Sequence, residues 1–163
     1  MRPLVHVLAF NAAWYACVRV RGLPGAAAAA SLAVLHVGLA RDRARQARVI
    51  LVAAAAGFLA DSALERAGLF AFAGGPRVPG LAPLWVLGLW LAFASLLPQC
   101  LAWLHRRPVV GALLGAVAGP LSYALGARLG GVTLGAWGYA AAAVEYAVAM
   151  PLLLLLARGG RRD

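Results

Sequence analysis

The sequence predicts an all-α, polytopic transmembrane helical bundle of about six spans, formed by a single domain over residues 1–163. Composition is the first observation behind this prediction, because 64% of the residues are hydrophobic and only 12% are charged. A soluble domain carries roughly 25% charged residues. The second observation is that the apolar residues form blocks of about 17 to 25 residues, which can cross a hydrocarbon core of roughly 30 Å.

The charge distribution is the third observation. The formal net charge is +10, and all fifteen basic residues are arginines in short connections or near the ends of apolar blocks. No extended basic region with interleaved aromatic residues is present, which argues against nucleic acid as a partner. Membrane lipids are the predicted partners, and a membrane protein partner or a second copy of the chain remains open.

The first two spans are predicted over residues 3–20 and 24–40. The second span contains the alanine run 26–30, and small residues let two helix backbones approach closely in a membrane. The arginine-rich segment 41–48 follows and is predicted to be a solvated loop.

The third span is predicted over residues 49–72 and the fourth over residues 83–104. The loop 74–80 between them is rich in glycine and proline, which break helices. Pro98 predicts a kink in the fourth span. Trp85 and Trp103 lie near its two ends and are predicted to sit at opposite membrane interfaces.

The fifth span is predicted over residues 109–127 and the sixth over residues 133–157. Glycines recur every four residues in the fifth span, at Gly111, Gly115 and Gly119. This spacing places them on one helix face, so they predict a helix-packing seam in preference to a ligand site.

An even number of spans places both termini on one side. Ten arginines fall on that side and five on the other. Arginine and lysine are enriched in cytoplasmic connections, so both termini are predicted to lie in the cytoplasm, with the protein in an inner membrane.

Acidic residues inside the predicted spans are the most informative local feature. A charged side chain near the middle of a bilayer costs about 2.5–3.5 kcal/mol on insertion scales. Asp61 and Glu65 are four residues apart and share a helix face, which Ser62 flanks. At about 1.5 Å of rise per residue, they lie in the outer half of the third span.

The fifth span places Ser122 and Tyr123 at a matching depth, with Arg128 near the outer boundary. We therefore predict a polar pocket that opens to the outer leaflet and is formed by Asp61, Ser62, Glu65, Ser122, Tyr123 and Arg128, with Arg19 or Arg21 as further candidates. The alternative is purely structural. Asp61 would then pair with Arg128 to lock two helices, or Glu65 would reach interfacial water.

Glu145 and Asn11 are predicted to lie near the midplane. They could serve a proton relay, or they could form a neutral hydrogen bond between two helices, and the hydrogen bond is the favoured interpretation. The three histidines and two cysteines lie far apart in the sequence without metal-ligand spacing. No metal site, no cofactor and no catalytic residue is therefore assigned.

Several motifs together resemble one bacterial family of small inner-membrane proteins. They are Phe10-Asn11…Trp14…Cys17-Val18, Gly57-x-x-x-Asp61-Ser62-x-Leu64-x-x-x-Gly68, Pro83-Leu84-Trp85…Leu89-Trp90-x-x-Phe93 and Gly119-Pro120-Leu121-Ser122-Tyr123-x-x-Gly126-x-x-Leu129-Gly130. The chain is similar to the domain-of-unknown-function family 2878 over nearly its whole length. The resemblance implies no reaction, but it implies that Asp61, Ser62, Ser122 and Tyr123 belong to the family pattern. Pro98-Gln99-Cys100 stands where the family pattern implies a polar stretch with asparagine.

Two functions stay open at this point. The first is an accessory protein of membrane-lipid metabolism or envelope homeostasis, or a binder of a lipid-like molecule in the outer-half pocket. The second is a small proton-coupled transporter that uses the intramembrane acids. An enzyme that acts on lipid is less favoured, because the sequence places no histidine near Ser62 or Ser122 to activate a nucleophile.

Overall fold

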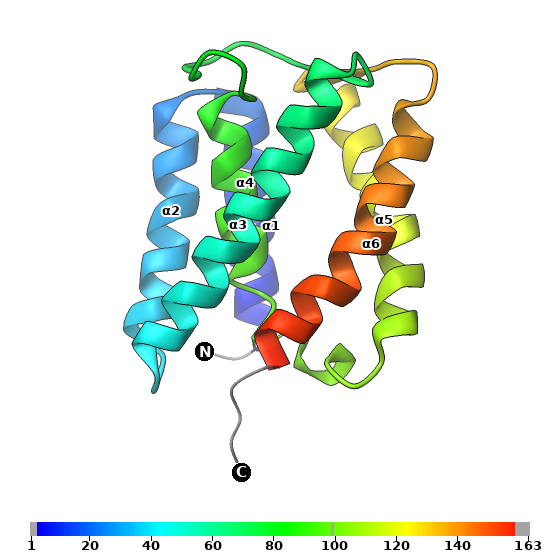
Figure 1. The fold of residues 1–163 in the computed structure, drawn as a ribbon. Helices are drawn as coiled ribbons and strands as arrows, with labels where there is room; N and C mark the ends of the chain where they lie inside the picture. Colours follow the sequence, from blue (N-terminus) through cyan, green and yellow to red (C-terminus); the bar gives the residue numbers. More distant parts are fainter. Residues whose placement is uncertain (1–2, 99, 159–163) are drawn as a thin grey trace.

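The computed structural model describes residues 3–98 and 100–158, and within them it has six α-helices (Figure 1). One short 3₁₀-helix and two short strands complete the described elements. In chain order the elements are α1 (Pro3–Val20), α2 (Leu23–Gly38), α3 (Arg43–Arg66), β1 (Phe70–Phe72), α4 (Leu84–Ala94), η1 (Ala102–Leu104), α5 (Pro108–Arg128), β2 (Val132–Leu134) and α6 (Gly138–Arg158). The all-helical prediction is confirmed, and α1, α2 and α5 match their predicted ranges to within two residues.

The prediction of a solvated loop over residues 41–48 is wrong for most of that segment, because α3 begins at Arg43. Asp42 caps the helix, and its side chain accepts a hydrogen bond from the backbone N–H of Arg45 at 3.0 Å. Aspartate is a strong N-cap residue because it satisfies a backbone donor that the first turn leaves free. The Arg45 guanidinium also donates to the carbonyl oxygen of Ala157 at 2.6 Å, which ties the start of α3 to the end of α6.

The third and sixth spans were predicted too long on one side. α3 ends at Arg66, and the next residues form β1, which pairs antiparallel with β2 in the register Phe70↔Leu134. Gly68 has φ +73°, a left-handed conformation that favours glycine and turns the chain out of the helix. Residues 70–72 and 132–134 thus form a two-stranded ribbon, and α6 begins only at Gly138.

The fourth span is a broken element rather than a kinked helix. α4 ends at Ala94, and turns and η1 carry the chain to Leu104. Proline disfavours helical geometry in the residue before it and has no N–H to donate, which accounts for a helix that ends before Pro98. Gln99 lies outside the described residues. Trp85 is 2% exposed, and its indole N–H donates to the carbonyl oxygens of Ala73 and Gly74, so this ring packs inside the bundle.

The glycine seam of α5 packs against α6. A Cβ at Gly111 would meet Leu154, one at Gly115 would meet the backbone of Tyr146, and one at Gly119 would meet Tyr146 and the carbonyl oxygen of Ala142. The prediction of a helix-packing role is confirmed. Small residues act in the same way between α2 and α4, where a Cβ at Gly88 would lie 2.9 Å from the Cα of Ala26.

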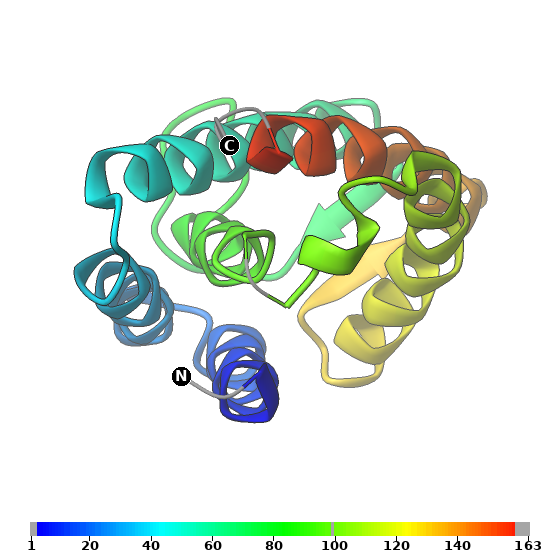
Figure 2. The same ribbon diagram turned by 90° about the horizontal axis from the view of Figure 1, so that it is seen from below.

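The helices form two groups that α3 connects. α4 contacts α1, α2 and α3, whereas α5 packs mainly on α6, and α3 contacts both α4 and α6 (Figure 2). One end of the bundle carries β1 and β2 and is called the ribbon end. The other carries the start of α1 at Pro3 and the end of α6 at Arg158, and is called the terminal end (Figure 1).

The outer faces of the helices are apolar. Large hydrophobic side chains are exposed along α5, among them Val109, Leu113, Val117 and Leu121, each more than 60% exposed. α3, α5 and α6 are each long and apolar enough to cross a membrane, whereas α1, α2 and α4 are shorter apolar helices. Monomeric soluble proteins rarely expose contiguous apolar surface on this scale.

Candidate functional site: an aromatic cavity with Asp61 in its wall

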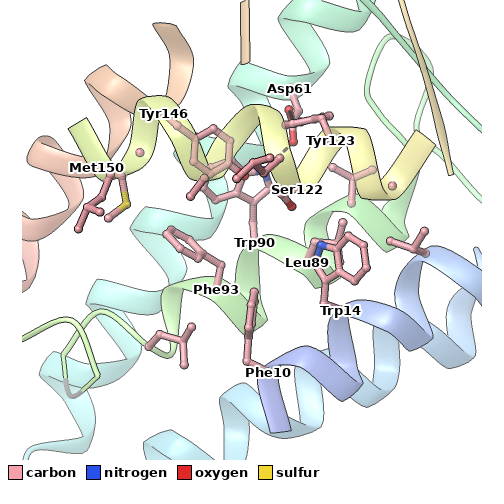
Figure 3. Close-up of a pocket in the computed structure, with 18 of the residues that line it drawn as sticks. Phe10, Trp14, Asp61, Leu89, Trp90, Phe93, Ser122, Tyr123, Tyr146 and Met150 are labelled. Atoms are coloured by element: carbon pink, nitrogen blue, oxygen red, sulfur yellow. Dashed lines mark hydrogen bonds between the residues drawn. The ribbon is translucent and has the colours of Figure 1, made fainter. Parts of the chain in front are cut away.

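A cavity of about 480 Å³ lies between the two groups of helices. α1, α4, α5 and α6 contribute most of its wall, and α3 contributes Asp61. The lining is almost entirely apolar and rich in aromatic rings, including Phe10, Trp14, Trp90 and Phe93 (Figure 3). Such a surface suits a hydrophobic ligand that one or a few polar groups orient.

Both α1 and α5 line the cavity. In Figure 2 these two helices stand apart on the same side of the bundle. Its α5 wall includes Leu114, Val117 and Leu121, whose exposed fractions are 44%, 61% and 64%. The cavity is therefore accessible from the apolar outer surface of the helices.

Asp61 is the one acidic residue among the described residues that line this cavity, and it is only 2% exposed. The indole N–H of Trp90 donates to Asp61 Oδ2 at 2.7 Å, and the hydroxyl of Tyr123 donates to Asp61 Oδ1 (Figure 3). A buried carboxylate requires such partners, because an unpaired polar group in an apolar medium is costly. Three helices, α3, α4 and α5, thus meet at one carboxylate.

Aromatic contacts hold the two donors in place. The ring of Trp90 stacks on Tyr146 with centroids 5.5 Å apart, and Tyr123 stacks on Phe70 of β1 at 4.5 Å. Gly57, one helical turn before Asp61, allows the indole of Trp90 to lie directly against α3, since a Cβ there would overlap the ring. The ribbon and α6 therefore position the groups that bind Asp61.

Ser62 and Glu65 lie near Asp61 in sequence, but their side chains form hydrogen bonds with residues at the ribbon end. The Ser62 hydroxyl donates to the carbonyl oxygen of Phe58 at 2.7 Å and accepts from the backbone N–H of Ala82 at 3.0 Å. Glu65 Oε1 accepts from the backbone N–H of Phe72 at 3.0 Å and lies 3.5 Å from the Arg77 guanidinium. Neither residue lines the cavity.

Of the remaining predicted site residues, some line the cavity and others lie outside it. Ser122 lines the cavity beside Tyr123, whereas Arg128 is exposed at the end of α5. Within the described residues no ion pair joins Arg128 to Asp61, so the predicted structural pair is absent there. Arg21 donates to the carbonyl oxygen of Gly130 at 2.7 Å and closes the ribbon end instead of reaching the acids.

Asn11 and Glu145 do not form the predicted hydrogen bond. The Asn11 side-chain amide donates to the carbonyl oxygen of Val7 within α1 at 2.8 Å. Glu145 lines a second, more open groove with residues of α3 and α6, among them Leu64 and Val144. Its carboxylate oxygens are buried and accept no hydrogen bond from the part of the chain that the structure describes.

Two histidines that are distant in sequence meet at the terminal end. The rings of His6 and His36 have centroids 3.7 Å apart, and the two residues are 2% and 1% exposed. His36 Nδ1 lies 2.7 Å from the carbonyl oxygen of Leu32. Among the described residues, no group of three or more His, Cys, Asp or Glu side chains could hold a metal ion.

The comparison with protein families supports the resemblance that the sequence motifs indicated. The family model described as a protein of unknown function, DUF2878, matches residues 3–152. The chain belongs to the DUF2878 family. No curated protein and no solved structure matches it. In this DUF2878 chain, Gly57, Asp61, Trp90 and Tyr123 come from three separate motifs and converge at one point of the cavity.

Trp90 and Tyr146 are site residues that the sequence analysis did not select. Trp90 stood in a motif of the DUF2878 resemblance, but without a fold it was one of five tryptophans in an apolar chain. Tyr146 directly follows Glu145 in an apolar segment and belongs to no motif of the resemblance. A signal was available in both cases, since tryptophan and tyrosine carry a polar group that needs a partner when it is buried.

Proposed function

We propose that this DUF2878 protein is an integral protein of a bacterial inner membrane that binds a lipid-like molecule in its aromatic cavity. Such a protein would act as an accessory to membrane-lipid metabolism or envelope homeostasis. The observation that carries the proposal is the cavity itself. It is apolar, has one buried carboxyl group in its wall, and is lined on α5 by side chains that are exposed on the apolar outer surface. A lipid could enter it sideways from the bilayer without crossing water.

The proposal includes six crossings with both termini in the cytoplasm. Support comes from the three long apolar helices, from the apolar outer faces, and from the shared terminal end of α1 and α6. α1 and α2 have 18 and 16 residues, about 27 and 24 Å of helix, which is slightly short of a roughly 30 Å hydrocarbon core. Local thinning of the bilayer accommodates short spans of this kind at modest cost.

The orientation is tested with reporters fused after the last residue and inserted in the loop between β1 and α4. A reporter that is active only outside the cytoplasm should be silent at the C-terminus and active in the loop, because the arginine bias places the termini inside. The reverse pattern would contradict the proposed orientation. Activity of the same reporter at both positions would contradict the crossing number.

A cavity-filling substitution tests lipid binding. Ala118 lines the cavity on α5 and is exposed, whereas the seam glycines are buried, so Ala118→Phe should occupy the space with little effect on helix packing. We expect wild-type protein, extracted in mild detergent, to carry a tightly bound lipid-like molecule that mass spectrometry detects. The amount per protein should fall about tenfold in Ala118→Phe, which corresponds to about 1.4 kcal/mol of binding free energy.

Ala28→Phe is the matched control, because Ala28 is exposed on α2 and lines neither cavity nor groove. It should retain the bound molecule in full. An unchanged amount of the same molecule in Ala118→Phe would refute binding in the cavity.

The transporter alternative has less support, since Asp61 and Glu145 face different openings. Unaltered lipids with altered proton flux in a deletion strain would favour it.

A further inference from the structure

A cluster of polar groups in the cavity wall comes from Asp61, Trp90, Ser122 and Tyr123. Two of its proton donors are already used, since the Trp90 indole N–H and the Tyr123 hydroxyl both donate to the Asp61 carboxylate. An indole has one donor and no acceptor, and a tyrosine hydroxyl keeps acceptor capacity after it donates. Acceptor lone pairs therefore remain available at Asp61 and Tyr123, and the Ser122 hydroxyl can both donate and accept.

No positive charge balances this carboxylate from within the cavity. The described lining residues include no arginine, lysine or histidine. Arg21 is engaged at the carbonyl oxygen of Gly130, and Arg128 is exposed and absent from the lining. A phosphate or carboxylate head group would meet a like charge in an apolar surrounding, and juxtaposed like charges suppress such partners strongly.

The larger apolar part of the cavity extends from Asp61 toward the terminal end, and a smaller part lies toward the ribbon end. Its wall on α5 runs from Tyr123 back to Leu114, nine residues or about 14 Å of helix. This length is close to half of a hydrocarbon core of roughly 30 Å, the depth that one lipid chain spans. A volume of about 480 Å³ also lies in the lower part of the range for pockets that hold one small ligand.

We propose that the cavity selects a single-chain amphiphile whose head group donates a hydrogen bond and carries no negative charge. An alcohol or an amine has this chemistry. The head group donates to the Asp61 carboxylate, an amine can donate a second hydrogen bond to the Tyr123 oxygen, and the chain lies along Phe10, Phe93 and Met150. This inference rests on the proposed function, because it specifies which lipid-like molecules the same cavity accepts.

A series of probes with one common sixteen-carbon chain tests the inference on the full-length protein in detergent. The probes are the primary alcohol, the primary amine, the methyl ether of the alcohol, the fatty acid and the alkyl phosphate. Binding is followed by tryptophan fluorescence, since Trp14 and Trp90 line the cavity. We expect the alcohol and the amine to bind about tenfold more tightly than the other three. A site built to accept a hydrogen bond from an O–H or N–H group rejects analogues that lack such a donor.

Asp61→Asn provides a second measurement. The asparagine amide keeps one acceptor and adds a donor, so the preference for the alcohol over the ether should fall to about threefold or less. The wild-type series is decisive even if this variant does not fold. Equal binding of all five probes, or tighter binding of the acid, would overturn the inference and leave lipid binding intact. Failure of every probe to bind would overturn the proposed function together with the inference.

Discussion

Gly57→Ala is expected to lower the free energy of unfolding by about 2–3 kcal/mol, because overpacking in a tightly packed contact is costly. The indole of Trp90 lies directly against Gly57, and the added methyl group would overlap its ring. Trp90 is 3% exposed and is held by Tyr146, so the ring has little room to move. Denaturant titration of the purified protein in detergent measures the change.

The same substitution should also impair the cavity, since a displaced indole can no longer donate to Asp61. The amount of co-purified lipid-like molecule should therefore fall along with stability. In a Trp90→Leu background the overlapping ring is gone, and Gly57→Ala should cost less than half as much, because residues in contact are energetically coupled. An identical cost in both backgrounds would show that the glycine matters for another reason.

Gly115→Ala is expected to lower the free energy of unfolding by a similar amount, about 2–3 kcal/mol. A Cβ at this position would lie 2.7 Å from Met150 Cγ and closer still to the carbonyl oxygen of Tyr146. A flexible methionine can move, but the backbone of α6 cannot move without separating the two helices. The variant should reach a lower level in the membrane and unfold at a lower denaturant concentration.

Gly38→Ala is the matched control for both glycine variants. Gly38 ends α2, and a Cβ there would meet nothing within 4 Å. Alanine is the better helix former, so this change should be neutral or slightly stabilising. A loss at Gly38 equal to the loss at Gly115 would mean that glycine is needed for reasons other than close helix contact.

The positions of the helices were largely predictable, because apolar blocks of bilayer length identify them without knowledge of their neighbours. The residues at which the helices begin and end were less predictable. Asp42 is an N-cap within an arginine-rich segment, and the solvated appearance of that segment concealed the first turn of α3. Residues 70–72 and 132–134 are short apolar stretches beside apolar helices, so their pairing across sixty residues of chain left no local signal.

The candidate site was predicted in part. Asp61, Ser122 and Tyr123 do line one cavity, as their matching depths suggested. Glu65 and Arg128 belong to the ribbon end instead. Glu65 turns to the backbone N–H of Phe72, a donor that exists in that place only because the chain leaves α3 after Arg66 and forms β1.

The amino-acid sequence by itself determined roughly where six helices lie, which helix faces carry glycine, and that Asp61 needs a partner. Helical periodicity and hydropathy are properties of each segment alone, so they can be read without the fold. Only the tertiary structure decided that the partners of Asp61 are Trp90 and Tyr123, 29 and 62 residues away. A hydrogen bond acts over about 3 Å, so its partner depends on which helix faces meet, and helix packing sets that.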